Sequence, residues 1–180
     1  MGRRFRIDGK VYLSWALGLL ILPPEWAGAL FLGILVHEFC HFGMAKILGV
    51  RVSGVRWEMG GCRMDTEPMD PKEEAMVALA GPVGSFCLLG LMRYYPALGI
   101  CGGLQGVWNL LPIYPRDGGR VLRCLAGEAV YTSVSFVANL ALLIVGTIAS
   151  YQLKSLWILL LMLWKWAGRT GHMKNTLQSG

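Results

Sequence analysis

Apolar residues occupy long runs of the chain, separated by short polar segments. Runs of about 17 to 25 apolar residues are long enough to cross the hydrocarbon core of a bilayer as helices. We therefore predict an all-α polytopic membrane protein with one domain over residues 1–180. Its about six transmembrane helices are expected near residues 11–22, 26–48, 75–92, 97–113, 131–151 and 155–167.

The longest polar interruption, between the second and third spans, has the pattern of strands. Residues 50–59 alternate imperfectly between apolar and polar, Gly60 and Gly61 are typical of a turn, and residues 62–65 can pair back. This pattern predicts a small membrane-associated β-hairpin, whose edge could bind an extended substrate as an added strand. A plain interfacial loop is the alternative. Residues 5–7 and 11–13 are expected to form short strands around a turn at Asp8-Gly9.

Two further segments have clear backbone signals. Asp70-Pro71 followed by acidic residues predicts a capped start for the third helix, and Gly81-Pro82 predicts a kink within it. Residues 112–119 contain two prolines and two glycines, so the fourth span is expected to end in unwound backbone. Unwound backbone at membrane depth is tolerated where it lines a site.

Composition agrees with a membrane protein, since 54% of residues are hydrophobic, 16% are charged and the mean hydropathy is +0.49. The net charge of +6 does not indicate nucleic-acid binding, because no basic run is interleaved with aromatic residues. Every lysine and arginine except Arg93 and Lys154 falls in a segment that six spans would place on one side. The positive-inside rule then predicts that both termini are cytoplasmic. No cleavable signal peptide is expected.

The candidate chemistry lies in the second span, which carries the sequence His37-Glu38-Phe39-Cys40-His41. Histidines four residues apart share one helix face and can bind one zinc ion, with the glutamate placed as general base on a zinc-bound water. Two histidines and a carboxylate are costly at that depth in lipid, which indicates a function. Two structural histidines are the alternative. His172, the third histidine of the chain, is assigned no role.

A hydrolytic zinc site needs a third protein ligand and an open position. Asp117 is the best candidate, because it follows the broken end of the fourth span and precedes Gly118 and Gly119. Two alternatives stay open: Cys40 could be the third ligand, and Asp117 could be a helix cap. The five cysteines are an odd number without a C-x-x-C pair, so no disulfide framework is expected.

The two motifs together resemble those of the site-2 proteases, which are zinc intramembrane proteases, and the Asn109–Gly119 stretch is especially similar to the sporulation branch that releases a pro-sigma factor. The resemblance implies one zinc per chain, held by His37, His41 and Asp117, with Glu38 as base and proton shuttle. It also implies that Asn109 contacts the substrate or the oxyanion. Pro115, Gly118 and Gly119 are implied to shape the motif.

Three positions depart from the family pattern: the Phe39-Cys40 pair, Arg116 where an apolar residue is usual, and Ser85 where Asn is frequent. None of them removes a catalytic group. No PDZ-like insertion and no CBS domain is expected within the 180 residues.

The resemblance implies an intramembrane zinc endopeptidase that cuts a transmembrane or membrane-associated protein near the cytoplasmic face, in regulated intramembrane proteolysis. A sigma-factor or transcription-factor precursor is the expected substrate, and remnant signal peptides compete with it. The other expected partners are the lipid bilayer and a regulatory membrane protein. Nucleic acid is not expected as a partner. A metal-binding or metal-transporting membrane protein and an inactive protease-like scaffold are the alternatives.

Overall fold

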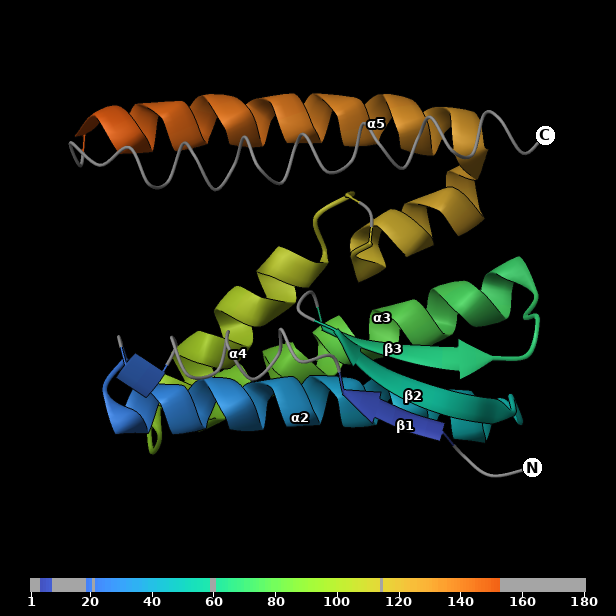
Figure 1. Cartoon of the computed structure of the whole chain (residues 1–180), viewed down its shortest axis with the longest axis horizontal. Helices are drawn as coiled ribbons and strands as arrows, with labels where there is room; N and C mark the ends of the chain where they lie inside the picture. Colours follow the sequence, from blue (N-terminus) through green and yellow to red (C-terminus); the bar gives the residue numbers. More distant parts are fainter. Residues whose placement is uncertain (1–3, 8–18, 21, 59–60, 114, 153–180) are drawn as a thin grey trace. The chain divides into compact units, whose positions relative to one another are not determined.

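The computed structural model describes residues 4–7, 19–20, 22–58, 61–113 and 115–152 (Figure 1). The chain divides into two units, residues 1–132 and residues 133–180, and the elements that form the site belong to the first. The described elements, in chain order, are β1 (Arg4–Ile7), α2 (Pro24–Ile47), β2 (Val52–Glu58), β3 (Gly61–Thr66), α3 (Pro71–Cys87), η1 (Leu88–Leu91), α4 (Pro96–Asn109) and α5 (Asp117–Gln152).

The small sheet has the strand order β1-β2-β3. The predicted hairpin is present, because β2 and β3 pair antiparallel with Trp57 opposite Cys62. The N-terminal strand was expected to pair with residues 11–13, but β1 instead pairs parallel with β2, with Phe5 opposite Val55. Residues 11–13 lie outside the described residues. Within the described chain, β2 is therefore the central strand and β3 an outer strand.

Helix α2 carries the histidine motif and is bounded by local signals. Pro24 occupies the first turn, where its missing N–H costs nothing. Gly49, just after the helix, has φ +75°. The N–H of Gly49 donates to the carbonyl of Lys46, and the N–H of Val50 donates to the carbonyl of Ala45. The helix therefore ends in a Schellman motif. Its 24 residues give a length of about 36 Å, enough to cross a hydrocarbon core of about 30 Å.

Helix α3 begins as predicted. Pro71 lies in the first turn, and the N–H of Asp70 donates to the Glu73 carboxylate at 3.1 Å. The helix passes through Pro82 to Cys87 and continues as η1 to Leu91. The predicted third span at residues 75–92 is therefore present, with an earlier start.

One predicted helix boundary was wrong. The fourth span was expected at residues 97–113, but α4 ends at Asn109, because Pro112 and Pro115 cannot continue the ladder of hydrogen bonds. Its 14 residues reach about 21 Å, so a crossing of the hydrocarbon core of about 30 Å would include the irregular residues that follow the helix. The fifth span was expected at residues 131–151, and α5 covers these residues. The helix is interrupted at Gly127, whose φ of 81° and ψ of 171° are not helical, so a separate short helix precedes the residues of the expected span.

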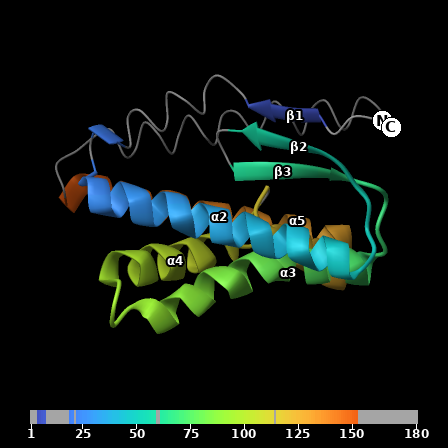
Figure 2. The same ribbon diagram turned by 90° about the horizontal axis from the view of Figure 1, so that it is seen from below.

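The first unit packs with small side chains inside and large apolar ones outside. Helices α2, α3 and α4 lie side by side (Figure 2). The buried alanines are Ala27, Ala45, Ala75, Ala78 and Ala97, whereas the exposed apolar side chains include Phe31, Leu32, Phe39, Met76, Leu79, Val83 and Leu104. This reversal of the water-soluble pattern is typical of helices in lipid.

Three described helical segments are long and apolar enough to cross a membrane: residues Pro24–Ile47, Pro71–Leu91 and Asp117–Gln152. The chain is thus a membrane protein built mainly of helices, with a small sheet. Apart from Leu19, Leu20 and Leu22, the predicted spans at 11–22 and 155–167 lie outside the described residues.

Candidate metal centre

His37 and His41 point from one face of α2 into the packed interior of the first unit. Only 3% and 5% of their surfaces are exposed. The two rings meet edge to face, with centroids 4.6 Å apart and an interplanar angle of 85°, and the two Nε2 atoms are 3.0 Å apart. The four-residue spacing therefore brings the same nitrogen of each ring to one point.

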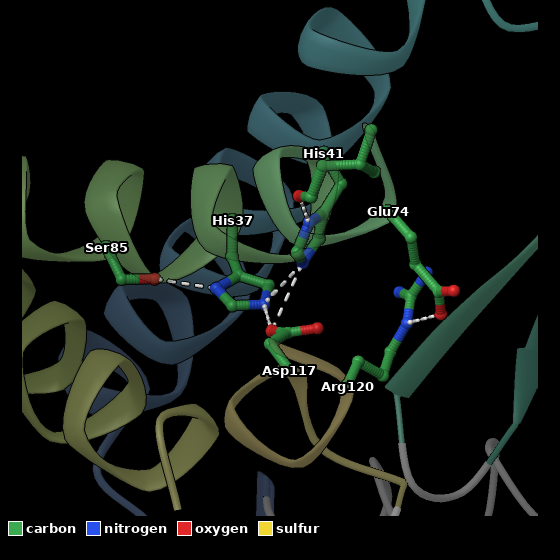
Figure 3. A network of polar contacts seen from close by, with 7 residues as sticks. His37, His41, Glu74, Ser85, Asp117 and Arg120 are labelled. Atoms are coloured by element: carbon green, nitrogen blue, oxygen red, sulfur yellow. Dashed lines mark hydrogen bonds and ion pairs between the residues drawn. The ribbon is translucent and has the colours of Figure 1, made fainter. Parts of the chain in front are cut away.

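Helix α3 orients both rings through their Nδ1 atoms (Figure 3). Nδ1 of His41 donates to the carbonyl of Val77 at 2.7 Å, and Nδ1 of His37 lies 2.9 Å from the hydroxyl of Ser85. Since a carbonyl only accepts, the proton of neutral His41 is on Nδ1 and its Nε2 carries a lone pair. Outer partners of this kind fix the tautomer of metal-binding histidines.

Gly81 lies between these two contact points on α3. A β-carbon there would overlap Nε2 and Cε1 of His41 and would lie 2.8 Å from Cε1 of His37. Glycine is therefore the residue that lets α3 approach the two rings. Val77, Gly81 and Ser85 follow one another at intervals of four residues, so they form one stripe along the helix.

Asp117 reaches the same point from the first residue of α5 and is 8% exposed. Its Oδ2 atom lies 3.1 Å from Nε2 of His37 and 3.3 Å from Nε2 of His41. Gly118 permits the placement, because a β-carbon there would overlap the backbone of Leu110. The broken segment thus folds back on the end of α4, and this brings residue 117 to the histidines.

The three atoms fit a zinc ion. They form a triangle with sides of 3.0, 3.1 and 3.3 Å, a few tenths of an ångström below the separation of about 3.3 to 3.6 Å for tetrahedral ligands at about 2.0 to 2.2 Å from zinc. The lone pair on Nε2 of His41 and the carboxylate of Asp117 face each other, and a cation between them would satisfy both, with Nε2 of His37 able to supply a second nitrogen lone pair. The donor set of two imidazoles and one carboxylate leaves a fourth position open, as in hydrolytic zinc sites.

Among the described residues, the group of ligand-type side chains at this point consists of His37, His41 and Asp117. Cys40, the alternative third ligand, is not part of it. The Cys40 sulfur packs instead against Gly84 of α3, where a β-carbon would overlap it. Asp117 is the first residue of a helix, but its carboxylate faces the two histidines. This orientation favours a function as ligand over the alternative function as helix cap.

The other candidate residues lie on the elements that carry this group or next to them. Glu38 follows His37 on α2 and is half-buried, and Asn109 ends α4 and is half-buried. In the broken segment Pro115 is exposed, and Gly118 and Gly119 are buried. Arg116, unusual before the aspartate, places its guanidinium 3.9 Å from the centre of the Trp108 ring.

Sequence reasoning missed how α3 serves the site. It identified Gly81 as part of a kink and Ser85 as a departure from the family pattern, but neither as a neighbour of the two histidines. It also missed the carbonyl of Val77 and the ion pairs that Glu74 makes with Arg120 and Arg123 at 3.3 and 3.2 Å. The spacing of residues 74, 77, 81 and 85 marks one helix face and was the available signal.

No family model matches the chain. The chain is 29% identical over 178 residues to the zinc metalloprotease MJ0392 of Methanocaldococcus jannaschii, a match that covers 84% of this chain and 51% of the relative. It is 33% identical over 122 residues to Rip3 of Mycobacterium tuberculosis, whose name also describes a zinc metalloprotease, covering 57% of this chain and 31% of Rip3. The chain thus spans about half the length of the first relative and about a third of the second.

Among solved structures, the fold matches the site-2 protease from Methanocaldococcus jannaschii. The TM-score is 0.65 at 21% sequence identity, and the match covers 91% of this chain and 87% of that one. At this identity the structural likeness concerns the fold.

Proposed function

We propose that the chain is a zinc-dependent intramembrane endopeptidase of the site-2 protease type, a proposal supported by its similarity to zinc metalloproteases and by the likeness of its fold to that of a site-2 protease. His37, His41 and Asp117 are the ligands of one zinc ion, and Glu38 is the general base. The carrying observation is the convergence of two imidazole nitrogens and one carboxylate oxygen within 3.3 Å of one another. The donors come from α2 and α5, two helices long and apolar enough to cross a membrane.

The reaction follows from the placement of the side chains. His37, His41 and Asp117 would hold the zinc ion, which would supply the Lewis acid for activating water at neutral pH and for polarising a peptide carbonyl. Glu38 accepts a proton from the attacking water, whose oxygen bonds to the carbonyl carbon, and returns that proton to the amide nitrogen as the carbon–nitrogen bond breaks. Ser85 and Val77 hold the two imidazoles in the required orientation. Asn109 stabilises the developing oxyanion.

The substrate is bound as an extended strand. A peptide bond within a helix has its carbonyl engaged and is not accessible, so the substrate segment must unwind near the site. In the described chain β2 is paired on both sides, and β3 offers an outer edge to which an extended peptide can add. Main-chain hydrogen bonds to β3 would then keep the scissile segment open.

The finer assignments belong to the same proposal. About six spans in one domain over residues 1–180 place both termini in the cytoplasm, and cleavage occurs near that face. The substrate is a membrane-associated precursor of a sigma or transcription factor, as in regulated intramembrane proteolysis during sporulation. The basic loops are the support for the orientation, and the Asn109–Gly119 motif is the support for the substrate class.

The test combines zinc content with cleavage of a co-expressed, tagged and membrane-tethered sigma-factor precursor. We expect about one zinc per chain in the wild type and in Glu38→Gln, less zinc in Asp117→Ala, and cleavage by the wild type alone. Glu25→Gln is the matched control, since Glu25 is an exposed glutamate in the first turn of the same helix. Cleavage by Glu38→Gln at a rate near wild type would remove Glu38 as the base. Full zinc content in Asp117→Ala would remove Asp117 as a ligand.

A further inference from the structure

A cluster of three charges links α3 to the start of α5. One carboxylate oxygen of Glu74, Oε1, lies 3.3 Å from Nε of Arg120 and 3.2 Å from Nη2 of Arg123. The side chains of these residues are 23%, 31% and 42% exposed, so the cluster is partly withdrawn from water. Figure 3 shows the Glu74–Arg120 pair beside the histidines and Asp117.

Each helix joined by this cluster also contributes to the metal centre. Glu74 lies three residues before Val77, whose carbonyl accepts the hydrogen bond from His41. It therefore extends the stripe of α3 that contacts the histidines. The two arginines lie three and six residues after Asp117, within the first two turns of α5. The helix that orients the histidines is thus tied directly to the helix that begins with the carboxylate.

We propose that Glu74, Arg120 and Arg123 are positioning residues, which hold Asp117 at the correct height and rotation relative to His37 and His41. This inference rests on the assignment of those three residues as zinc ligands. It adds a function for a charge cluster that lies outside the metal centre and does not contact the reacting atoms.

The need for such a cluster follows from distances. Metal–ligand distances tolerate about 0.2 Å, whereas a slip of α5 by one residue would move Asp117 by about 1.5 Å along the helix axis. Gly118 fixes the local path of the chain against Leu110, but that contact lies within the broken segment itself. Arg120 and Arg123 are about 4.5 Å apart along α5, and both bind the carboxylate of Glu74 on α3. Acting together, the two contacts restrict both the sliding and the rotation of α5.

The experiment measures the zinc dissociation constant of the full chain in detergent by competition with a chelator. We expect Glu74→Gln to weaken zinc binding about tenfold, the lower end of the effects seen for outer partners of metal ligands. Glu73→Gln is the matched control. Glu73 is next to Glu74, and its carboxylate accepts a hydrogen bond from the N–H of Asp70, the residue that caps α3. Its affinity should stay within about twofold of wild type. Equal affinities of the two variants would overturn the proposal.

A cycle of variants separates positioning from general stability. Arg120→Met with Arg123→Met should weaken zinc binding as Glu74→Gln does, and the triple variant should be no weaker than either. Arg120→Lys, which keeps the charge, should lose less affinity and keeps the test available if a harsher variant does not fold. Effects that simply add would show that the three residues do not act as a unit and would overturn the proposal.

Asp117→Ala, measured beside these variants, separates this inference from the proposed function. Wild-type zinc affinity in Asp117→Ala would remove the ligand assignment itself. Lost affinity in Asp117→Ala with unchanged affinity in Glu74→Gln would leave the ligand assignment intact and refute the positioning function alone.

Discussion

The backbone of Gly81 lies against the imidazole of His41 so closely that a β-carbon at residue 81 would overlap Nε2 and Cε1 of the ring. Nε2 is the atom that faces Asp117 at 3.3 Å. Glycine has a hydrogen atom where other residues have a β-carbon. Gly81 therefore leaves the space that Nε2 of His41 occupies. The approach of α3 to α2 and the geometry of the metal centre depend on the same residue.

Replacing Gly81 by alanine should displace His41 and weaken zinc binding. Overpacking of a well-packed site costs about 1 to 3 kcal/mol, which corresponds to a roughly 5- to 150-fold loss of affinity. The zinc dissociation constant of the solubilised chain measures this. Gly43→Ala is the control on α2, because nothing lies within 4 Å of a β-carbon there. An unchanged dissociation constant in Gly81→Ala would mean that α3 does not constrain the ring.

Ser85→Ala should weaken zinc binding by about 10- to 100-fold, because it removes the hydroxyl beside Nδ1 of His37 and leaves a buried ring nitrogen without that partner. Zinc titration against a competing chelator gives the value. Ser53→Ala, which removes an exposed serine that donates to the carbonyl of Asp65, should bind zinc as wild type does. If both serine variants bind zinc equally well, Ser85 is only a packing residue.

Gly118→Ala should abolish cleavage and lower zinc content, because its β-carbon would overlap the backbone of Leu110 and push Asp117 away from the histidines. Backbone cannot yield as a flexible side chain can. Gly90→Ala adds the same methyl group at a position with nothing within 4 Å, and should retain zinc. Normal zinc content in Gly118→Ala would show that the start of α5 does not depend on this contact.

The contact of Arg116 with Trp108 should contribute a coupling free energy of about 0.5 to 1 kcal/mol, the range for partly exposed cation–π pairs. A double-mutant cycle with Trp108→Leu and Arg116→Gln, read by the free energy of unfolding in detergent, isolates this value. Additive effects of the two changes would mean that the charge and the ring do not stabilise each other. The cycle thereby tests whether Arg116, the unusual residue before Asp117, stabilises the fold through its contact with Trp108.

The centre of the site could be predicted because its signals are local or strongly chemical. His37 and His41 lie one helical turn apart, and polar residues in an apolar run have few structural explanations. Asp117 was predicted from the broken backbone and the glycines that follow it, and the structure brings its carboxylate to the two imidazoles.

The remaining features depend on contacts distant in sequence. The pairing of β1 with β2 joins Phe5 to Val55, and a parallel partner fifty residues away leaves no local pattern. The early end of α4 at Asn109 was missed because its apolar residues continue past the helix. The ion pairs of Glu74 were missed since they connect residues 46 and 49 positions apart, and charged side chains near membrane surfaces are common.

The hydrogen bond from His41 to Val77 ends on a main-chain oxygen. Every amino acid carries that oxygen, so homologous chains could have different apolar residues at this position and keep the bond. What must be inherited is the number of residues between the start of α3 and Gly81. Insertion or deletion of one residue in that interval would be far more damaging than any conservative exchange at Val77. At Val77, unlike at Gly81 and Ser85, spacing rather than residue identity carries the information for the metal centre.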